Sequence, residues 1–207
     1  MNARYLTLVL TMVFAIGLSA TANADTLATN SSALASGSAS ISQSTTPKFF
    51  AHVDYAVYSP GDYPGSLTFP ADKYVYCYQL FNDSTSTSNI TSLNIGIDPL
   101  ASVSNTNYDS APLSGMTGGV NPASYGYSNN QVQYVFTSRN SIAVNQHSSV
   151  LIFTSDLAPD SIMGTGLLGT VNAGSFKVAI PVPIPEPASV FILALGTPAL
   201  LAIRRRK

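Results

Sequence analysis

Proline at every second position makes residues 181–187 the most conformationally restricted part of this 207-residue sequence. The segment reads Pro-Val-Pro-Ile-Pro-Glu-Pro. Each proline fixes its backbone φ and has no amide hydrogen to donate, so the segment must be extended, at about 3.1 Å per residue. We expect that it cannot enter the interior of a preceding sheet, and that a following helix cannot extend back through it.

A run of 16 uncharged residues, Ala188 to Ile203, follows these prolines. As a helix it would be about 24 Å long, slightly shorter than a hydrocarbon core of ~30 Å. Pro198 lies inside the run and is expected to kink it. The next four residues are all basic: Arg204, Arg205, Arg206 and Lys207. We predict a single transmembrane helix with this basic group on the cytoplasmic side.

Glu186 is the only glutamate in the chain. A carboxylate beside an apolar span is costly to bury in lipid, so Glu186 should mark the boundary with water. The flanking prolines should hold the backbone open there. The expected result is a rigid, exposed peptide just outside the bilayer, accessible to a membrane-embedded processing enzyme.

The first 24 residues have the three parts of a secretory signal. Arg4 precedes an apolar run from Tyr5 to Leu18, and the small residues Ala22 and Ala24 form a signal peptidase site. We predict export through the Sec translocon, with Asp25 as the first mature residue. The alternative is an uncleaved anchor, but the 14-residue run is short for a span of about 20 residues.

Together, the Pro-Glu-Pro motif, the apolar span and the basic tail resemble the PEP-CTERM sorting signal. The resemblance covers residues 181–207, and its core motif falls on Pro185, Glu186, Pro187, Ala188 and Ser189. It implies an inner-membrane precursor processed by an exosortase, an integral-membrane cysteine transpeptidase-like enzyme. It further implies a place on the cell surface or in the extracellular polysaccharide or biofilm matrix of a diderm bacterium. A plain single-span anchor without processing is the alternative.

Residues 25–46 are predicted to form a flexible linker. Eleven of these 22 residues are Ser or Thr, which leaves too little apolar surface to offset the entropy lost on ordering. The segment is read either as an unmodified spacer or as a carrier of O-linked sugars.

Residues 47–180 are predicted to form one all-β passenger domain, a β-sandwich. Short β-branched and aromatic runs alternate there with turn residues, and no convincing helical periodicity is present. The stretch 102–130 is expected to be long and loop-like, with a weak strand that the pattern does not place. Strands are predicted at 49–58, 73–81, 90–97, 131–138, 141–145, 149–155 and 175–180.

The run from Lys73 to Phe81 alternates most clearly. Its period of two places Tyr74, Tyr76 and Tyr78 on one face and Cys77 on the other. The tyrosines are read either as a half-buried structural face or as an exposed platform for stacking of sugar rings. Cys77, the only cysteine, excludes an internal disulfide and is interpreted as a small buried core residue rather than a reactive thiol.

The sequence contains no recognisable catalytic motif. Neither G-x-S-x-G nor H-E-x-x-H occurs, and His52 and His147 are the only histidines. We therefore expect no enzyme activity, no cofactor and no metal site. A hydrolase would require two Asp side chains within about 10 Å, and a calcium site would require Asp side chains at strand ends. Residues 25–180 contain nine Asp and four Lys or Arg, which argues against nucleic-acid binding.

Overall fold

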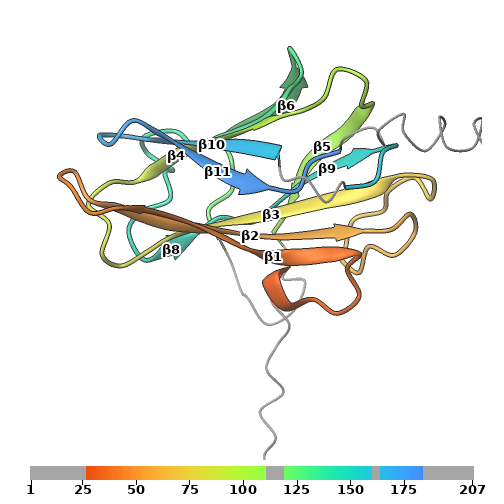
Figure 1. Ribbon diagram of the computed structural model, residues 1–207, viewed down its shortest axis with the longest axis horizontal. Coiled ribbons are helices and arrows are strands. Elements are labelled where there is room, and N and C mark those ends of the chain that lie inside the picture. Colours follow the sequence, from red (N-terminus) through yellow and green to blue (C-terminus); the bar gives the residue numbers. More distant parts are fainter. Residues whose placement is uncertain (1–26, 111–118, 160–163, 184–207) are drawn as a thin grey trace, which may run out of the picture.

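The protein folds into two antiparallel β-sheets that lie one over the other (Figure 1). The computed structural model describes residues 27–110, 119–159 and 164–183. Sheet A has the order β1-β2-β3-β9-β5, with β8 beside β3. Its strands are β1 (Ala35–Gln43), β2 (Phe49–Tyr58), β3 (Tyr74–Asn82), β5 (Val103–Asp109), β8 (Gln146–His147) and β9 (Val150–Ser155).

Sheet B has the order β11-β10-β4-β7-β6. Its strands are β4 (Ile90–Gly96), β6 (Ser124–Ser128), β7 (Gln131–Val135), β10 (Gly164–Thr170) and β11 (Ser175–Ile180). A 3-10 helix, η1 (Leu27–Thr29), precedes β1. The all-β fold class is therefore confirmed. The predicted signal helix and transmembrane helix lie outside the described residues.

The main core fills the space between the two sheets. Successive side chains of a strand point to opposite faces, so every second residue of each strand points into this core. Val53 and Tyr76 come from sheet A, and Leu93 and Tyr134 come from sheet B. Aromatic rings stack within it, with ring centroids 4.7 Å apart for Phe49 and Phe176. The sandwich is thus held by apolar burial between layers.

Most of the strand predictions are confirmed. The predicted strands at 49–58 and 175–180 coincide with β2 and β11, and those at 73–81, 90–97, 131–138 and 149–155 overlap β3, β4, β7 and β9. The strand predicted at 141–145 is wrong. Only an isolated bridge between Ile142 and Ile90 forms there, and Asn145 has a φ of 62°, which breaks an extended strand.

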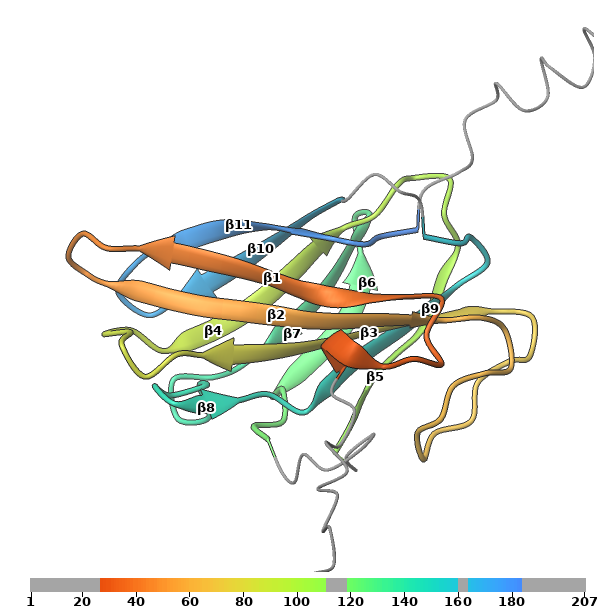
Figure 2. The same ribbon diagram turned by 60° about the horizontal axis from the view of Figure 1, so that its bottom comes forward.

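The predicted flexible linker is wrong over residues 35–43, because this segment is strand β1. It pairs with all of Phe49–Val57 of β2 (Figure 2). Serines occupy the exposed outer positions, whereas Ala39 and Ile41 face the core. A Cβ atom on Gly37 would lie 2.5 Å from the Tyr55 hydroxyl, so the small residue is needed for this contact. Buried or half-buried positions alternate with exposed ones in this strand, but most of the side chains are small, so the alternation is not visible as a contrast between hydrophobic and polar residues.

The stretch 102–130, predicted to be loop-like, contains two strands, β5 and β6. β6 and β7 form a hairpin whose two turn residues, Asn129 and Asn130, have φ values of 50° and 57°. Positive φ at both turn positions is the type I′ geometry, which Asn favours and which matches the twist of the flanking strands. β10 was also missed, since its three glycines lower the strand propensity.

Replacement of Ile41 tests whether β1 belongs to the folded domain. Ile41 is 8% exposed within the main core, so Ile41→Ala should lower the free energy of unfolding by about 2–4 kcal/mol. Urea unfolding followed by circular dichroism measures this. Ser40→Ala changes an exposed neighbour in the same strand and should have little effect. Equal midpoints for both variants would contradict the assignment of β1 to the core.

Candidate functional site

The tyrosine face predicted for sugar stacking is turned into the sandwich. Tyr76 and Tyr78 have no exposed surface, and Tyr74 is half-buried against the same core. The ring of Phe153 stacks on Tyr76 with centroids 5.0 Å apart and on Tyr78 at 6.0 Å. The alternation of β3 was therefore predicted correctly, but the carbohydrate face is wrong, because sheet B covers these rings.

The buried hydroxyls of this face donate to backbone carbonyls. Tyr76 donates to Leu157 O at 2.9 Å, and Tyr78 to Pro181 O at 2.5 Å. Tyr134 of sheet B donates to Ile152 O of sheet A at 2.6 Å. Burial raises the pKa of Tyr78 and of Tyr134 well above the ordinary 10.0. The three hydroxyls thus satisfy structural carbonyls, and none is available to a ligand.

Cys77 is fully buried on the opposite face of β3, as the sequence indicated. Burial, and secondarily the negative charge of Asp109, raises the pKa of its thiol. The thiolate is the nucleophilic form of cysteine, so this environment keeps Cys77 unreactive. It belongs to a second apolar cluster on the outer face of sheet A, together with Tyr58, Val75 and Ile152.

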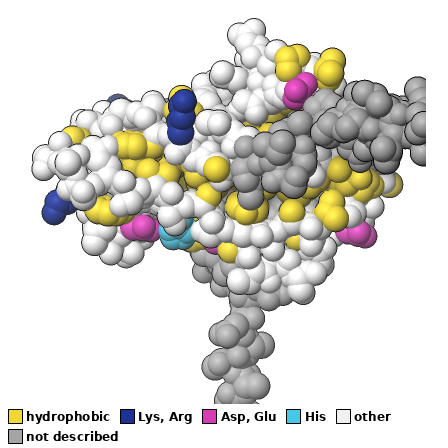
Figure 3. Space-filling model, viewed as in Figure 1, with side chains coloured by type: hydrophobic (Ala, Val, Ile, Leu, Met, Phe, Trp, Pro, Cys, Tyr) yellow, Lys and Arg dark blue, Asp and Glu magenta, His cyan; other side chains and the backbone are white. Residues whose placement is uncertain are grey.

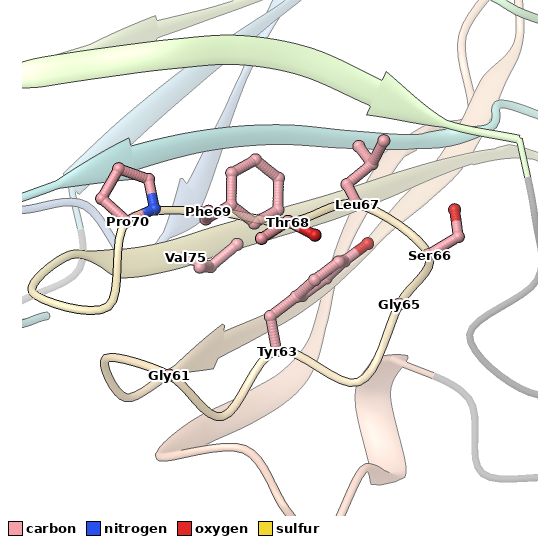
Figure 4. Close-up of a pocket in the computed structure, with 9 residues that line it drawn as sticks. All are labelled: Gly61, Tyr63, Gly65, Ser66, Leu67, Thr68, Phe69, Pro70 and Val75. Carbon is pink, nitrogen blue, oxygen red and sulfur yellow. The ribbon is translucent and has the colours of Figure 1, made fainter.

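A loop, residues 59–72, covers this second cluster and encloses a hollow of about 250 Å³ (Figure 4). Tyr63 and Phe69 of the loop lie near Val75 of β3, with the two rings edge to face at 5.1 Å. Asp109, 3% exposed at the end of β5, fastens the loop. Its carboxylate accepts hydrogen bonds from the Tyr63 hydroxyl at 3.0 Å and from the backbone and side chain of Ser66.

The two histidines, distant in the sequence, flank a single phenylalanine. Strand register places His52 of β2 and His147 of β8 opposite Phe81 of β3. The His52 ring is stacked on Phe81 at 4.5 Å, and the His147 ring lies 5.6 Å away on the other side. Asp83 Oδ1 is 3.0 Å from His52 Nδ1. Only the register of β3 with β2 and with β8 brings these residues together, so local motifs could not reveal them.

This row of three rings borders a shallow hollow of about 430 Å³, which Asp83, Asn145 and Gln146 also line. The His52 and Phe81 rings are nearly parallel, whereas the His147 ring is tilted by 35° relative to Phe81. Gln79 Nε2 lies 3.1 Å from His147 Nδ1 and donates to Ser148 O at 3.0 Å. The hollow contains one carboxylate, whereas glycoside hydrolysis uses a pair. The arrangement is a polar depression beside a row of three rings.

The predicted sorting residues, Pro185 to Ser189, lie outside the described residues, as do Ala22, Ala24 and the basic group 204–207. The chain just before the motif is described. Pro181, Val182 and Pro183 are buried on the sandwich, and Pro183 forms an antiparallel bridge with Pro159. The predicted domain ends at residue 180, whereas the described chain stays buried on the sandwich through Pro183. Prolines can lie along a sheet edge, where no donor is required.

No family model, curated protein or solved structure matches this chain. Within the described ranges, no cluster of three or more His, Cys, Asp or Glu side chains is placed to hold a metal ion. Among the same residues, no helix has the length and apolar character needed to cross a membrane. The residues predicted to form such a helix, 188–203, are not among them.

Because of these buried tyrosines, we predict that the free energy of unfolding falls in alkali. Above pH about 10 the unfolded chain releases tyrosine protons that the folded chain retains, so the unfolded state binds fewer protons and the free energy of unfolding falls. Each such tyrosine contributes about 1.4 kcal/mol per pH unit. Urea midpoints measured between neutral and alkaline pH should decrease, and Tyr134→Phe should make the decrease less steep. An unchanged slope in this variant would contradict the assigned burial.

Removal of the Asp109 carboxylate should loosen the loop 59–72. Asp109→Ala deprives Tyr63 and Ser66 of their acceptor, at a cost of about 1–3 kcal/mol. Local opening should then expose Cys77, and its rate of modification by a thiol reagent should rise about tenfold. Asp98→Ala, in an exposed turn, is the control and should leave the rate unchanged. Equal rates in both variants would show that Asp109 does not hold the loop.

Proposed function

We propose that the chain is an exported, exosortase-processed surface or extracellular-matrix protein that acts without catalysis. The proposal rests on the resemblance of residues 181–207 to the sorting signal and on the signal peptide predicted at residues 1–24. The described sandwich begins with the buried Leu27, and its buried residues continue through Pro183 into the first three residues of the predicted sorting segment.

The structural observation that bears on the proposal is the way in which the chain leaves the sandwich. The Tyr78 hydroxyl holds Pro181, Val182 is 3% exposed beside Gly164, and Pro183 bridges Pro159. Glu186 follows three positions later in the sequence. A processing enzyme would thus act on a motif that begins two residues after the buried Pro183.

The chemistry of the described surface agrees with a binding or structural role. Charged side chains are scattered on the face shown in Figure 3, which also shows hydrophobic side chains. Charged residues are 9% of the whole chain, far below the roughly 25% usual in soluble domains. The proposed partners are signal peptidase and the Sec translocon during export, then an exosortase at the inner membrane, and extracellular polysaccharide after release.

Substitution of Glu186 tests the processing step. The full precursor is produced in a diderm bacterium with and without an exosortase, and mass spectrometry defines both ends of the recovered protein. We expect a start at Asp25 in both strains and loss of the basic tail only with the exosortase. Glu186→Gln, which removes the charge and keeps the size, should leave the tail attached.

Lys177→Gln is the matched control, because it removes a charge from an exposed position of β11. It should be processed as the unmodified chain is. An intact tail on the unmodified chain in the presence of the exosortase would refute processing. Loss of the tail from the Glu186→Gln variant would instead show that the carboxylate is not recognised.

A further inference from the structure

Two of the ten tyrosines in the described ranges stand apart because they are exposed. Tyr125 and Tyr127 are 43% and 37% exposed, whereas the other eight are buried or half-buried. Both belong to β6, the edge strand of sheet B beside β7 (Figure 1). Positions two apart in a strand share a face and lie about 6.6 Å apart. The two rings therefore form a short aromatic row along the strand.

These rings project from the core-facing side of sheet B. Tyr125 pairs with Tyr134 and Tyr127 with Val132, so each points to the same side as a fully buried neighbour. Beneath them, β5 at the edge of sheet A supplies Tyr108, whose ring meets Tyr125 edge to face at 5.7 Å. The aromatic row thus lies on the core-facing side of sheet B, at the edge of this sheet, where sheet A leaves the two rings partly exposed.

The surroundings of the row are uncharged and rich in hydrogen-bonding groups. No charged residue occurs in the sequence between Asp109 and Arg139. The hairpin instead carries Ser, Asn and Gln, and the Tyr127 hydroxyl approaches Asn130 Oδ1 at 3.4 Å. The Ile97 amide donates to Asn130 O, which connects the chain after β4 to the hairpin turn.

We propose that the β6–β7 hairpin binds a neutral polysaccharide chain, with Tyr125 and Tyr127 as the residues that stack on its sugar rings. A sugar ring offers an apolar C–H face and a rim of hydroxyls, which match an aromatic ring beside amides and hydroxyls. Anionic polymers and nucleic acids require Lys or Arg, and neither strand of the hairpin contains one. The row follows the strand direction, as an extended polymer would.

This inference does not depend on cleavage at Glu186, and its test is separate. The full-length protein is run in native gels that contain dextran, hydroxyethyl cellulose or galactomannan, with alginate as the anionic comparison. We expect at least one neutral polymer to retard the protein, and alginate not to do so. The combined change Tyr125→Ala and Tyr127→Ala should raise the apparent dissociation constant about tenfold or more.

Two further variants separate stacking from other effects. Tyr125→Phe with Tyr127→Phe keeps both rings and should retain most of the binding. Val171→Ala, which shortens a side chain 52% exposed beyond β10, should bind as the unmodified chain does. Urea midpoints check that the alanine variant remains folded, as expected for exposed positions.

Three results would overturn the proposal: no retardation by any neutral polymer, undiminished retardation of the folded alanine variant, or equal retardation by alginate. Sedimentation tests the remaining alternative, which is association of two copies through the row. If the unmodified chain self-associates and the alanine variant does not, the row is an interface between two copies, and the assignment of a saccharide ligand is wrong.

Discussion

Three buried tyrosine hydroxyls tie the sandwich together. A hydroxyl in an apolar core is costly unless it is hydrogen-bonded, and the chain supplies a backbone carbonyl for each. Two of these bonds join the layers: Tyr78 of sheet A donates to Pro181 after β11, and Tyr134 of sheet B donates to Ile152 of sheet A. With a single cysteine, the protein has no internal disulfide, so directional contacts between the sheets come from such side chains.

The same interaction determines where the C-terminal segment leaves the domain. Because Tyr78 lies in the centre of sheet A, its bond to Pro181 holds the chain after β11 across the core face. Gly164 allows Val182 to pack there, since a Cβ atom at this position would lie 2.2 Å from the valine side chain. The proline-rich segment thus begins within the fold, where its first residues contact the sandwich.

Local pattern predicted the fold class because runs of large β-branched and aromatic residues favour strands. β2, β3 and β9 have β-branched or aromatic residues at most positions, and all three were found. β1 was missed because Ala, Gly and Ser form an alternation with little hydrophobic contrast, and its stability comes from pairing with β2. Similarly, the His52–Phe81–His147 row arises from register between three strands and has no local signal.

Tyr76-Cys-Tyr78 and Tyr125-Gly-Tyr127 show most clearly why the prediction of an exposed tyrosine face failed. The two segments have the same spacing of tyrosines, and the period of two of a strand places each pair on one face. What differs is the opposite layer: sheet B covers the first pair completely, whereas the edge of sheet A leaves the second open. Whether the opposite sheet covers a strand depends on the order of the strands, which contacts between distant parts of the chain determine. The position of a strand in its sheet therefore decides whether its aromatic side chains are exposed, and a strand at the edge is the one most easily left uncovered.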